Sequence, residues 1–409
     1  MGSSRTVSEN QLVLLLSAVQ FVNVLDFVMV LPLGPDFVEA LGMPPSALGL
    51  VGGSYTAAAA LGGLIGAAFL DRFDRRQALA VTVAGLVIAT AAGGFAFDLY
   101  SLLAARIAAG ALGGPATALC LAMIADTVPL ERRGRAMGTF MSSFSVASVL
   151  GVPAGLELAR ISSWRLPFFA VAALGLLIVP LAYRLLPPMR EHLERAQGPR
   201  PSLATLLRPT VLLSLSAIGF AMLGTFMLVP HVSSFAQLNL GLPRDDIKWL
   251  YLIGGAVSFL TVRIAGRLTD RYGPLPVASG AIAVFASVIY LSFVRPSHAA
   301  PAIVLLFSAF MVSSTFRFVP MQALSSRVPT LHERARFMSL QSTVQHAGSA
   351  LGSMLSSLML GTDSHGALTG METVGWLAIG ITLTLPFVLH ALHARLGAPP
   401  PTLPQVQAA

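Results

Sequence analysis

Asp26 and Arg106 are the residues whose types and surroundings most clearly allow chemistry. Of the 18 acidic residues in the chain, only Asp26 lies well inside a long apolar run, seven residues before its expected outer end. An ionised carboxylate in hydrocarbon is costly unless it is paired or hydrated, so such residues often mark ion pathways. Arg106 lies seven residues after the start of another apolar run, at a similar expected depth. The two residues predict either a site that binds and releases a proton or a permanent structural ion pair.

Other polar residues inside apolar runs are candidates for lining a substrate cavity. Arg317 is one of them, and no acid lies near it in the second half of the sequence. A hydrated cavity, an anionic substrate group or backbone carbonyls must then satisfy its guanidinium. Histidine titrates near neutral pH, so His346 could relay protons; hydrogen-bonded packing is the alternative. The cavity candidates are Gln20, Asn23, Thr225, His231, Arg317, Gln345 and His346.

Two charged segments between apolar runs repeat about half a chain apart. Asp71 and Asp270 are separated by 199 residues, and the segments 133–151 and 334–352 also match, at an offset of 201. Two matches at nearly the same offset predict a duplicated six-helix unit. We expect the charged segments to form a cytoplasmic latch that is closed in the outward-facing state; anchoring by arginine is the alternative. The latch residues are Asp71, Arg72, Asp74, Arg75, Arg76 and Asp126 in the first half and Gly266, Asp270, Arg271 and Gly273 in the second.

Composition places these residues in a membrane. The 409 residues are 55% hydrophobic and 11% charged, whereas soluble domains carry about a quarter charged residues. Apolar runs of about 20 residues recur, the length that crosses a hydrocarbon core of about 30 Å. We therefore predict an all-α membrane protein with twelve transmembrane helices in two pseudo-symmetric six-helix bundles. The predicted spans are 11–33, 46–70, 77–97, 99–125, 135–161, 165–187, 209–237, 247–269, 275–295, 301–326, 336–361 and 373–396.

The basic residues predict the orientation. The net charge is +8 and Lys248 is the only lysine, so nearly all of the positive charge is arginine. Eighteen basic residues lie at the termini or in the loops after the even-numbered spans, and five lie on the other side. The positive-inside rule then places both termini in the cytoplasm. The expected units are a first bundle at 1–187, a cytoplasmic linker at 188–208, a second bundle at 209–396 and a disordered tail at 397–409.

These motifs resemble those of the major facilitator superfamily. The family signature after helix 2, G-x-L-x-D-R-x-G-R-K/R, is matched in its first part by residues 266–273. The first copy departs from it at Ala67 and Asp74, where glycines are expected. Arg106, Gly110 and Gly113 are similar to the family motif of helix 4.

Two further stretches resemble the exporters of that family. Gly151, Pro153 and Gly155 match the Gly-Pro motif of helix 5, although its earlier glycines are missing. The stretch 25–35 resembles the first helix of bacterial drug–proton antiporters and of the arabinose-efflux-permease type.

The resemblance implies helices 1, 4, 7 and 10 around a central cavity, alternating access, and proton-driven efflux of small amphipathic compounds across a bacterial inner membrane. An uptake or facilitative carrier for a sugar, metabolite or organic anion is one alternative, and a lipid flippase is another. The expected partners are a small-molecule substrate, protons and lipid. We expect a monomer, with no cofactor, metal or nucleic acid. The chain has no phosphate-binding P-loop and no HExxH motif, so an enzyme is not expected.

Overall fold

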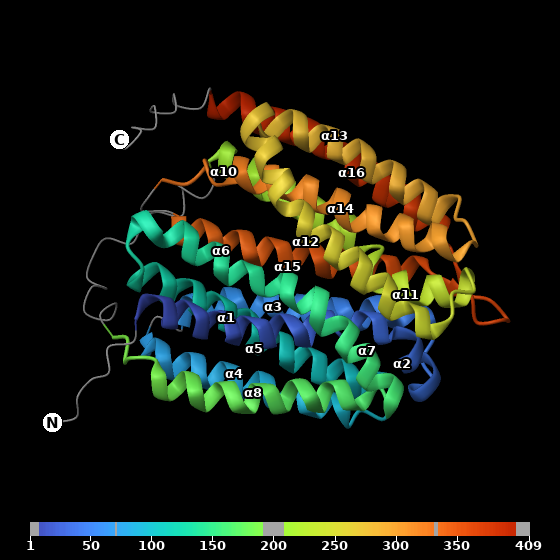
Figure 1. The fold of residues 1–409 in the computed structure, drawn as a ribbon, viewed down its shortest axis with the longest axis horizontal. Helices are drawn as coiled ribbons and strands as arrows, with labels where there is room; N and C mark the ends of the chain where they lie inside the picture. The colour runs from blue at the N-terminus through green and yellow to red at the C-terminus, as the bar shows by residue number, and fades with distance from the viewer. Residues whose placement is uncertain (1–7, 70–71, 191–207, 331–333, 398–409) are drawn as a thin grey trace.

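Long helices form two layers of the molecule (Figure 1). The computed structural model describes residues 8–69, 72–190, 208–330 and 334–397. We call the described residues up to 190 the first half and those from 208 the second half. The first half contains α1 (Glu9–Val28), α2 (Gly34–Leu41), α3 (Leu48–Phe69), α4 (Arg75–Gly94), α5 (Leu99–Thr127), α6 (Leu130–Val146), α7 (Val152–Ile161) and α8 (Arg165–Leu185).

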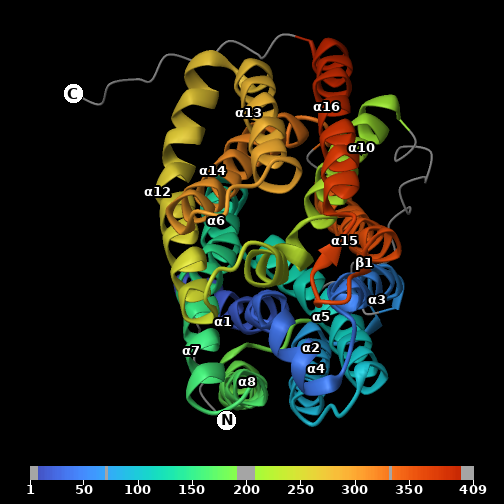
Figure 2. The same cartoon turned by 90° about the vertical axis from the view of Figure 1, so that its right-hand side faces the viewer.

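The second half repeats this plan. It contains α10 (Pro209–Phe226), α11 (Val232–Ser234), α12 (Ile247–Tyr272), α13 (Pro274–Ile289), α14 (Ala300–Ser325), α15 (Arg334–Met359) and α16 (Met371–Leu396), and a short antiparallel pair, β1 (Gly361–Thr362) and β2 (Leu368–Thr369). We call the end where α1 begins and α16 ends the proximal end, and the end that carries β1 the distal end. Viewed from the distal end, the first half lies below the second, and α15 packs against α3 between them (Figure 2).

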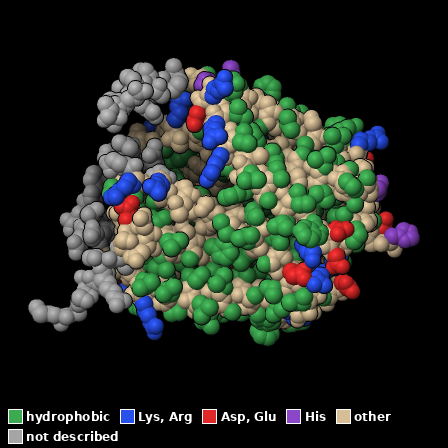
Figure 3. Space-filling model, viewed as in Figure 1, with side chains coloured by type: hydrophobic (Ala, Val, Ile, Leu, Met, Phe, Trp, Pro, Cys, Tyr) green, Lys and Arg blue, Asp and Glu red, His purple; other side chains and the backbone are tan. Residues whose placement is uncertain are grey.

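Helix length and composition support a membrane-spanning protein. Eleven stretches of the described residues are long and apolar enough to cross a bilayer. Hydrophobic side chains cover the middle of the face in Figure 3, and charged side chains gather at its two ends. The helix α15 is as long as its neighbours but richer in serine and glutamine, and it packs against other helices. The all-α prediction is confirmed, and the twelfth crossing stays a prediction.

Prolines break two of the predicted spans at corresponding places. The predicted span 11–33 is wrong at its end, because α1 stops at Val28, a 3-10 turn carries Pro32, and α2 runs on to Leu41. The α10 helix likewise ends before a 3-10 turn that carries Pro230. Proline lacks an N–H and clashes with the preceding turn, so it favours a kink or a break in a helix. Asp26 therefore lies fifteen residues before the end of its span, not seven.

Glycines let α3 and α5 approach closely. Gly110 and Gly114 lie one turn apart on α5, and a Cβ on either would overlap the backbone carbonyl of Tyr55 or Ala59 on α3. Small residues at such contacts allow helices to pack by van der Waals interaction where lipid supplies no hydrophobic drive. This contact fixes the distance between two helices that build the site described below.

Replacing Gly114 should therefore destabilise the protein. We expect Gly114→Ala to lower the free energy of unfolding by about 1–3 kcal/mol, because the added methyl overpacks the contact. Gly138→Ala is the matched control, since a Cβ there meets nothing within 4 Å, and it should be neutral or stabilise by up to about 1 kcal/mol. Thermal unfolding in detergent measures both; equal effects would contradict the close α3–α5 contact.

Candidate functional site

Asp26 is enclosed by α1, α4 and α5 with none of its surface exposed. Nη1 of Arg106 donates to its two carboxylate oxygens at 3.1 and 3.0 Å. Thr90 Oγ1 donates to Oδ1 at 2.8 Å. Arg106 is itself only 1% exposed. The structure thus brings together the two residues that the sequence singled out, inside the first half and away from lipid.

Tyr55 of α3 packs against this ion pair. The guanidinium carbon of Arg106 lies 4.5 Å from the centroid of the Tyr55 ring, a distance at which a cation is attracted to the ring face. The Tyr55 hydroxyl donates to Asn23 Oδ1 at 2.8 Å. The sequence analysis missed both Tyr55 and Thr90. Their only sequence signal was a hydroxyl inside an apolar run.

A chain of hydrogen bonds extends from Tyr55 along α1. Asn23 Nδ2 donates to the carbonyl of Gly113 at 2.9 Å and to Thr117 Oγ1 at 2.8 Å. Thr117 donates in turn to Gln20 Oε1 at 3.0 Å. Asn23 is 5% exposed, and its amide is fully used inside the first half. The structure therefore places Asn23 in the α1–α5 contact rather than on a cavity wall, whereas Gln20 is half-buried.

The glycines of the predicted helix-5 motif lie beside the same part of α1. Gly151 ends a π-helical turn, Ala147–Gly151, and Pro153 lies in the first turn of α7. A Cβ on Gly151 would overlap the side chain of Leu25, the neighbour of the buried carboxylate. A Cβ on Gly155 would be in ordinary van der Waals contact with Met29, the residue that follows α1. The motif therefore lets this segment pack closely against the helix that carries the ion pair.

Arg317 of α14 is the second fully buried arginine. Its Nη2 donates to Thr225 Oγ1 at 2.6 Å and lies 3.5 Å from the carbonyl of Ala221. The guanidinium carbon lies 4.1 Å from the centroid of the Phe285 ring. Nε and Nη1 have no hydrogen-bond partner among the described residues. Gln345 and His346 lie half-buried on α15, which packs against α10.

His231 lies where the two halves meet at the distal end. Its Nε2 is 3.0 Å from Ser356 Oγ of α15, and a Cβ on Gly49 of α3 would come within 3.1 Å of the same nitrogen. Ser233 Oγ donates to the carbonyl of Pro32 at 2.9 Å. His231 is therefore part of a tight contact between the halves, not of a cavity wall as the sequence predicted.

Two ion pairs join the halves at the distal end. Arg244 Nη2 lies 2.5 Å from Asp36 Oδ1, and Lys248 Nζ lies 2.9 Å from Glu157 Oε2. At the proximal end, by contrast, the face in Figure 3 is hollowed between the halves. Ion pairs thus join the halves at the distal end, and on this face a hollow lies between the halves at the proximal end.

The first charged segment is tied to its own half. Arg75 Nη1 lies 2.9 Å from Asp126 Oδ2. Asp74 caps α4 by accepting from the backbone N–H of Arg76 at 2.9 Å, and Arg190 Nε lies 3.1 Å from its other oxygen. Arg76 Nη1 donates to the carbonyl of Leu186, the residue after α8, at 3.3 Å. These contacts lie within the first half, so a latch between the halves stays a prediction.

The other predicted latch residues are more exposed or lie outside the described residues. Arg72, Asp270 and Arg271 are exposed, and the guanidinium of Arg271 lies over the ring of its own neighbour at 5.2 Å. Gly266 is half-buried. Gly273 joins α12 to α13 with φ +86°, a conformation that favours glycine. Asp71 lies outside the described residues.

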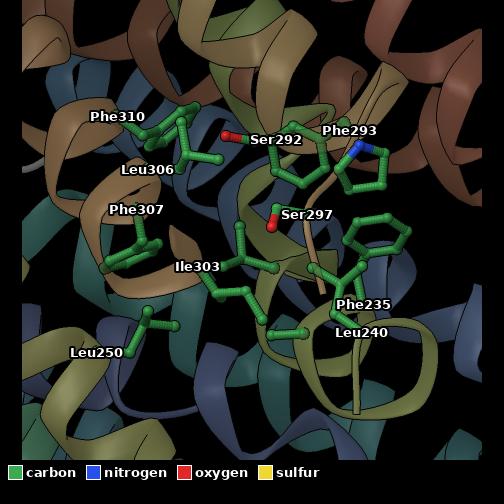
Figure 4. A pocket seen from close by; sticks show the side chains of 13 residues that line it. Phe235, Leu240, Leu250, Ser292, Phe293, Ser297, Ile303, Leu306, Phe307 and Phe310 are labelled. Carbon is green, nitrogen blue, oxygen red and sulfur yellow. The ribbon is translucent and has the colours of Figure 1, made fainter. Parts of the chain in front are cut away.

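A cavity of about 40 Å³ lies in the second half, close to the distal end. Phenylalanine and leucine side chains dominate its wall, with Ser292 and Ser297 as polar members (Figure 4). That volume holds a few water molecules at most. None of the predicted site residues lines it.

Comparison with known proteins decides the family. The family model of the Major Facilitator Superfamily matches residues 16–353 and 214–408. The chain belongs to the major facilitator superfamily. Members of this superfamily and its structural neighbours are transporters, not enzymes, and this protein is a multi-pass membrane transporter of that type.

Relatives within the superfamily have names that refer to different compounds. A chloramphenicol resistance protein of Streptomyces lividans is 27% identical over 366 residues, which cover 88% of this chain and 91% of the relative. A probable sugar efflux transporter of Pasteurella multocida is 24% identical and covers 66% of each chain. A bacterial homologue of the lysosomal transporter Spinster, in an inward-facing and occupied conformation, has a TM-score of 0.74 at 16% identity, covering 96% of this chain and 99% of the other.

The hydrogen bonds of Asp74 predict a pH-dependent stability. Burial raises the pKa of Asp74, but bonds from the backbone N–H of Met189 and Arg76 and from Arg190 outweigh it and lower the pKa below 3.8. The ionised group therefore stabilises the fold above the unfolded pKa near 4, and this contribution is lost as the pH falls through the folded pKa. Asp74→Asn should lower the Tm at pH 7 and have less effect below about pH 4. Asp270→Asn, at an exposed acid, is the control; a pH-independent effect of Asp74→Asn would contradict this reading.

The distal ion pairs predict coupling between the halves. Arg244→Asp places two acids together and should lower the Tm, and adding Asp36→Arg should restore most of the loss. A double-mutant cycle should give a coupling free energy of up to about 1 kcal/mol, as for partly exposed pairs. Purely additive effects would show that the pair does not hold the halves together.

Proposed function

We propose that this transporter exports small amphipathic compounds in exchange for protons, with Asp26 as the proton-binding group. One observation carries the proposal: a fully buried carboxylate in a membrane-spanning helix has Arg106 as its charged partner. A charged side chain inside a span costs free energy, and such residues often mark ion pathways.

The arrangement of the halves suits loading from the cytoplasm. The basic residues predict that both termini, and hence the proximal end, lie in the cytoplasm of a bacterial cell. The distal ion pairs Asp36–Arg244 and Glu157–Lys248 would then close the outer side. The hollow between the halves would open to the cytoplasm (Figure 3). A compound would enter there, and rocking of the halves around a midplane site would carry it outward.

Proton binding would act through Arg106. Donors contact both oxygens of Asp26, so proton binding competes with the hydrogen bonds from Arg106 and Thr90. A proton arriving from the outer side removes the negative charge that holds the guanidinium. Arg106 then keeps the ring of Tyr55 as its neighbour, and the contact of α1 with α5 loosens. Loss of one strong contact shifts the equilibrium between two packed arrangements of the same helices, as alternating access requires.

The names of the relatives favour export. One is a chloramphenicol resistance protein and another a probable sugar efflux transporter. The solved D-xylose–proton symporter has the same fold, with a TM-score of 0.72 at 17% identity. Proton-coupled uptake is therefore the alternative to export. We further propose that the protein acts as a monomer in the inner membrane.

Asp26→Asn separates proton-coupled transport from other mechanisms. In proteoliposomes with an imposed pH gradient and a compound panel that begins with chloramphenicol, we expect gradient-driven transport to fall at least about tenfold. Exchange of compound for compound at equal pH should persist, because it moves no net proton. Glu39→Gln, at an exposed acid of α2 on the same span, is the matched control and should transport like the wild type.

Two results would reject the proposal. If Asp26→Asn transports normally under the gradient, Asp26 is a structural partner of Arg106, and a facilitative carrier explains the fold better. If exchange at equal pH is lost together with gradient-driven transport, Asp26 acts in binding or folding rather than in proton coupling. Size-exclusion chromatography and thermal unfolding then distinguish those two roles.

A further inference from the structure

Arg317 is a buried cation for which the second half supplies no carboxylate. It is 1% exposed, and the sequences of α10, α13, α14 and α15 contain no aspartate or glutamate. A cation in a low-dielectric interior is costly unless an anion or well-placed acceptors neutralise it. Thr225 and Ala221 offer acceptors to Nη2 alone. Nη1 and Nε remain without a protein acceptor among the described residues.

The surroundings of Arg317 reproduce those of Arg106 with the acid left out. Each arginine lies on the fourth long helix of its half, and each guanidinium lies over an aromatic ring, at 4.5 Å in the first half and 4.1 Å in the second. Nη1 of Arg106 binds the carboxylate of Asp26. Nη1 of Arg317 is one of the atoms that lack a partner. The second half thus holds the cationic part of a carboxylate site.

Thr225 stands where the first half has its acid. It lies 199 residues after Asp26, the same offset that separates Asp71 from Asp270 in the repeated charged segments. Both residues lie on the first long helix of their half and contact the arginine. A hydroxyl accepts a hydrogen bond from the guanidinium but cannot neutralise its charge.

The nearby cavity does not supply the missing anion. Phe285, beneath Arg317, packs on Phe310 with ring centroids 4.9 Å apart. Phe310 is part of the wall of the apolar cavity in Figure 4. No charged side chain lines that cavity.

We propose that Arg317, with Thr225, binds a carboxylate of the transported compound. This rests on the proposed transport function and names the chemical class of its substrate: an amphipathic molecule with one carboxylate. The aromatic ring of Phe285 below the guanidinium suits a substrate with a flat apolar body. The carboxylate reaches Nη1 when the helices around Arg317 shift between the two arrangements of the transporter.

Benzoate and benzamide test the charge requirement, because they have nearly the same shape and differ in charge. Thermal unfolding of the purified full-length protein would be followed over a concentration series of each, since a ligand that binds the folded state raises the Tm. We expect a saturable rise with benzoate and an apparent affinity for benzamide at least about tenfold weaker. Arg317→Gln should lose the benzoate response. Arg263→Gln, at an exposed arginine of α12, should keep it.

Thr225→Asp tests the same site by gain of a partner. The new carboxylate should pair with Arg317 as Asp26 pairs with Arg106, so the Tm should rise and the response to benzoate should vanish. This variant keeps the proposal testable if Arg317→Gln does not fold. Chloride at the same concentrations should leave the wild-type Tm unchanged.

Several results would overturn the proposal. They are equal responses to benzoate and benzamide, no response of the wild type to benzoate, a benzoate response that survives in Arg317→Gln or Thr225→Asp, or a chloride response equal to that of benzoate, which would identify an inorganic-anion site. None of these measurements uses a pH gradient. Failure of proton coupling in Asp26→Asn would therefore be distinguishable from failure of carboxylate binding.

Discussion

A charge buried among apolar helices must be neutralised by a partner inside the bundle, and much of this structure follows from that requirement. Asp26 and Arg106 satisfy each other at 3.0 Å with almost no exposed surface. Removing one partner of such a pair leaves an uncompensated charge, which typically costs about 3–5 kcal/mol. The glycines of α5, and those of the motif Gly151, Pro153 and Gly155 beside α1, bring the helices close enough to form and enclose the pair.

The two halves share one arrangement of helices but differ in the partner of their buried arginine. Both break their first long helix at a proline, and both place an arginine of the fourth long helix over an aromatic ring. In the first half, an acid completes the charge balance. In the second half, a threonine occupies the corresponding place. We propose that this asymmetry places proton binding in the first half and substrate binding in the second, so that movement of one half against the other couples the two.

The sequence predicted the fold well because its signals are long and repeated. Apolar runs near 20 residues, the duplicated charged segments and the scarcity of acids indicated the helices, the repeat and Asp26. The helix α15 covers most of the predicted span 336–361, but its serines and glutamines lower its hydropathy, and it is not among the eleven stretches that are apolar enough to cross a bilayer. The extension of the first span to Leu41 was missed, because the prolines suggested an end where the chain only kinks.

The side-chain contacts of the site were harder to predict. Tyr55 and Thr90 carry no charge, so nothing in their apolar surroundings marked them as partners of the ion pair. Asn23 and His231 were placed on a cavity wall because they are polar. The structure instead uses them in helix contacts within the first half and between the halves. Polarity inside a span predicts that a partner exists, but only tertiary structure shows which one.

Proton release on compound binding tests the central claim most directly. If a proton and the exported compound exclude each other through Asp26, binding of one must weaken binding of the other by the same factor. Adding the compound to purified protein in weakly buffered solution should then release a proton, detected with a pH-sensitive dye, and Asp26→Asn should release none. Compound binding without proton release, or equal release from Asp26→Asn, would contradict the account.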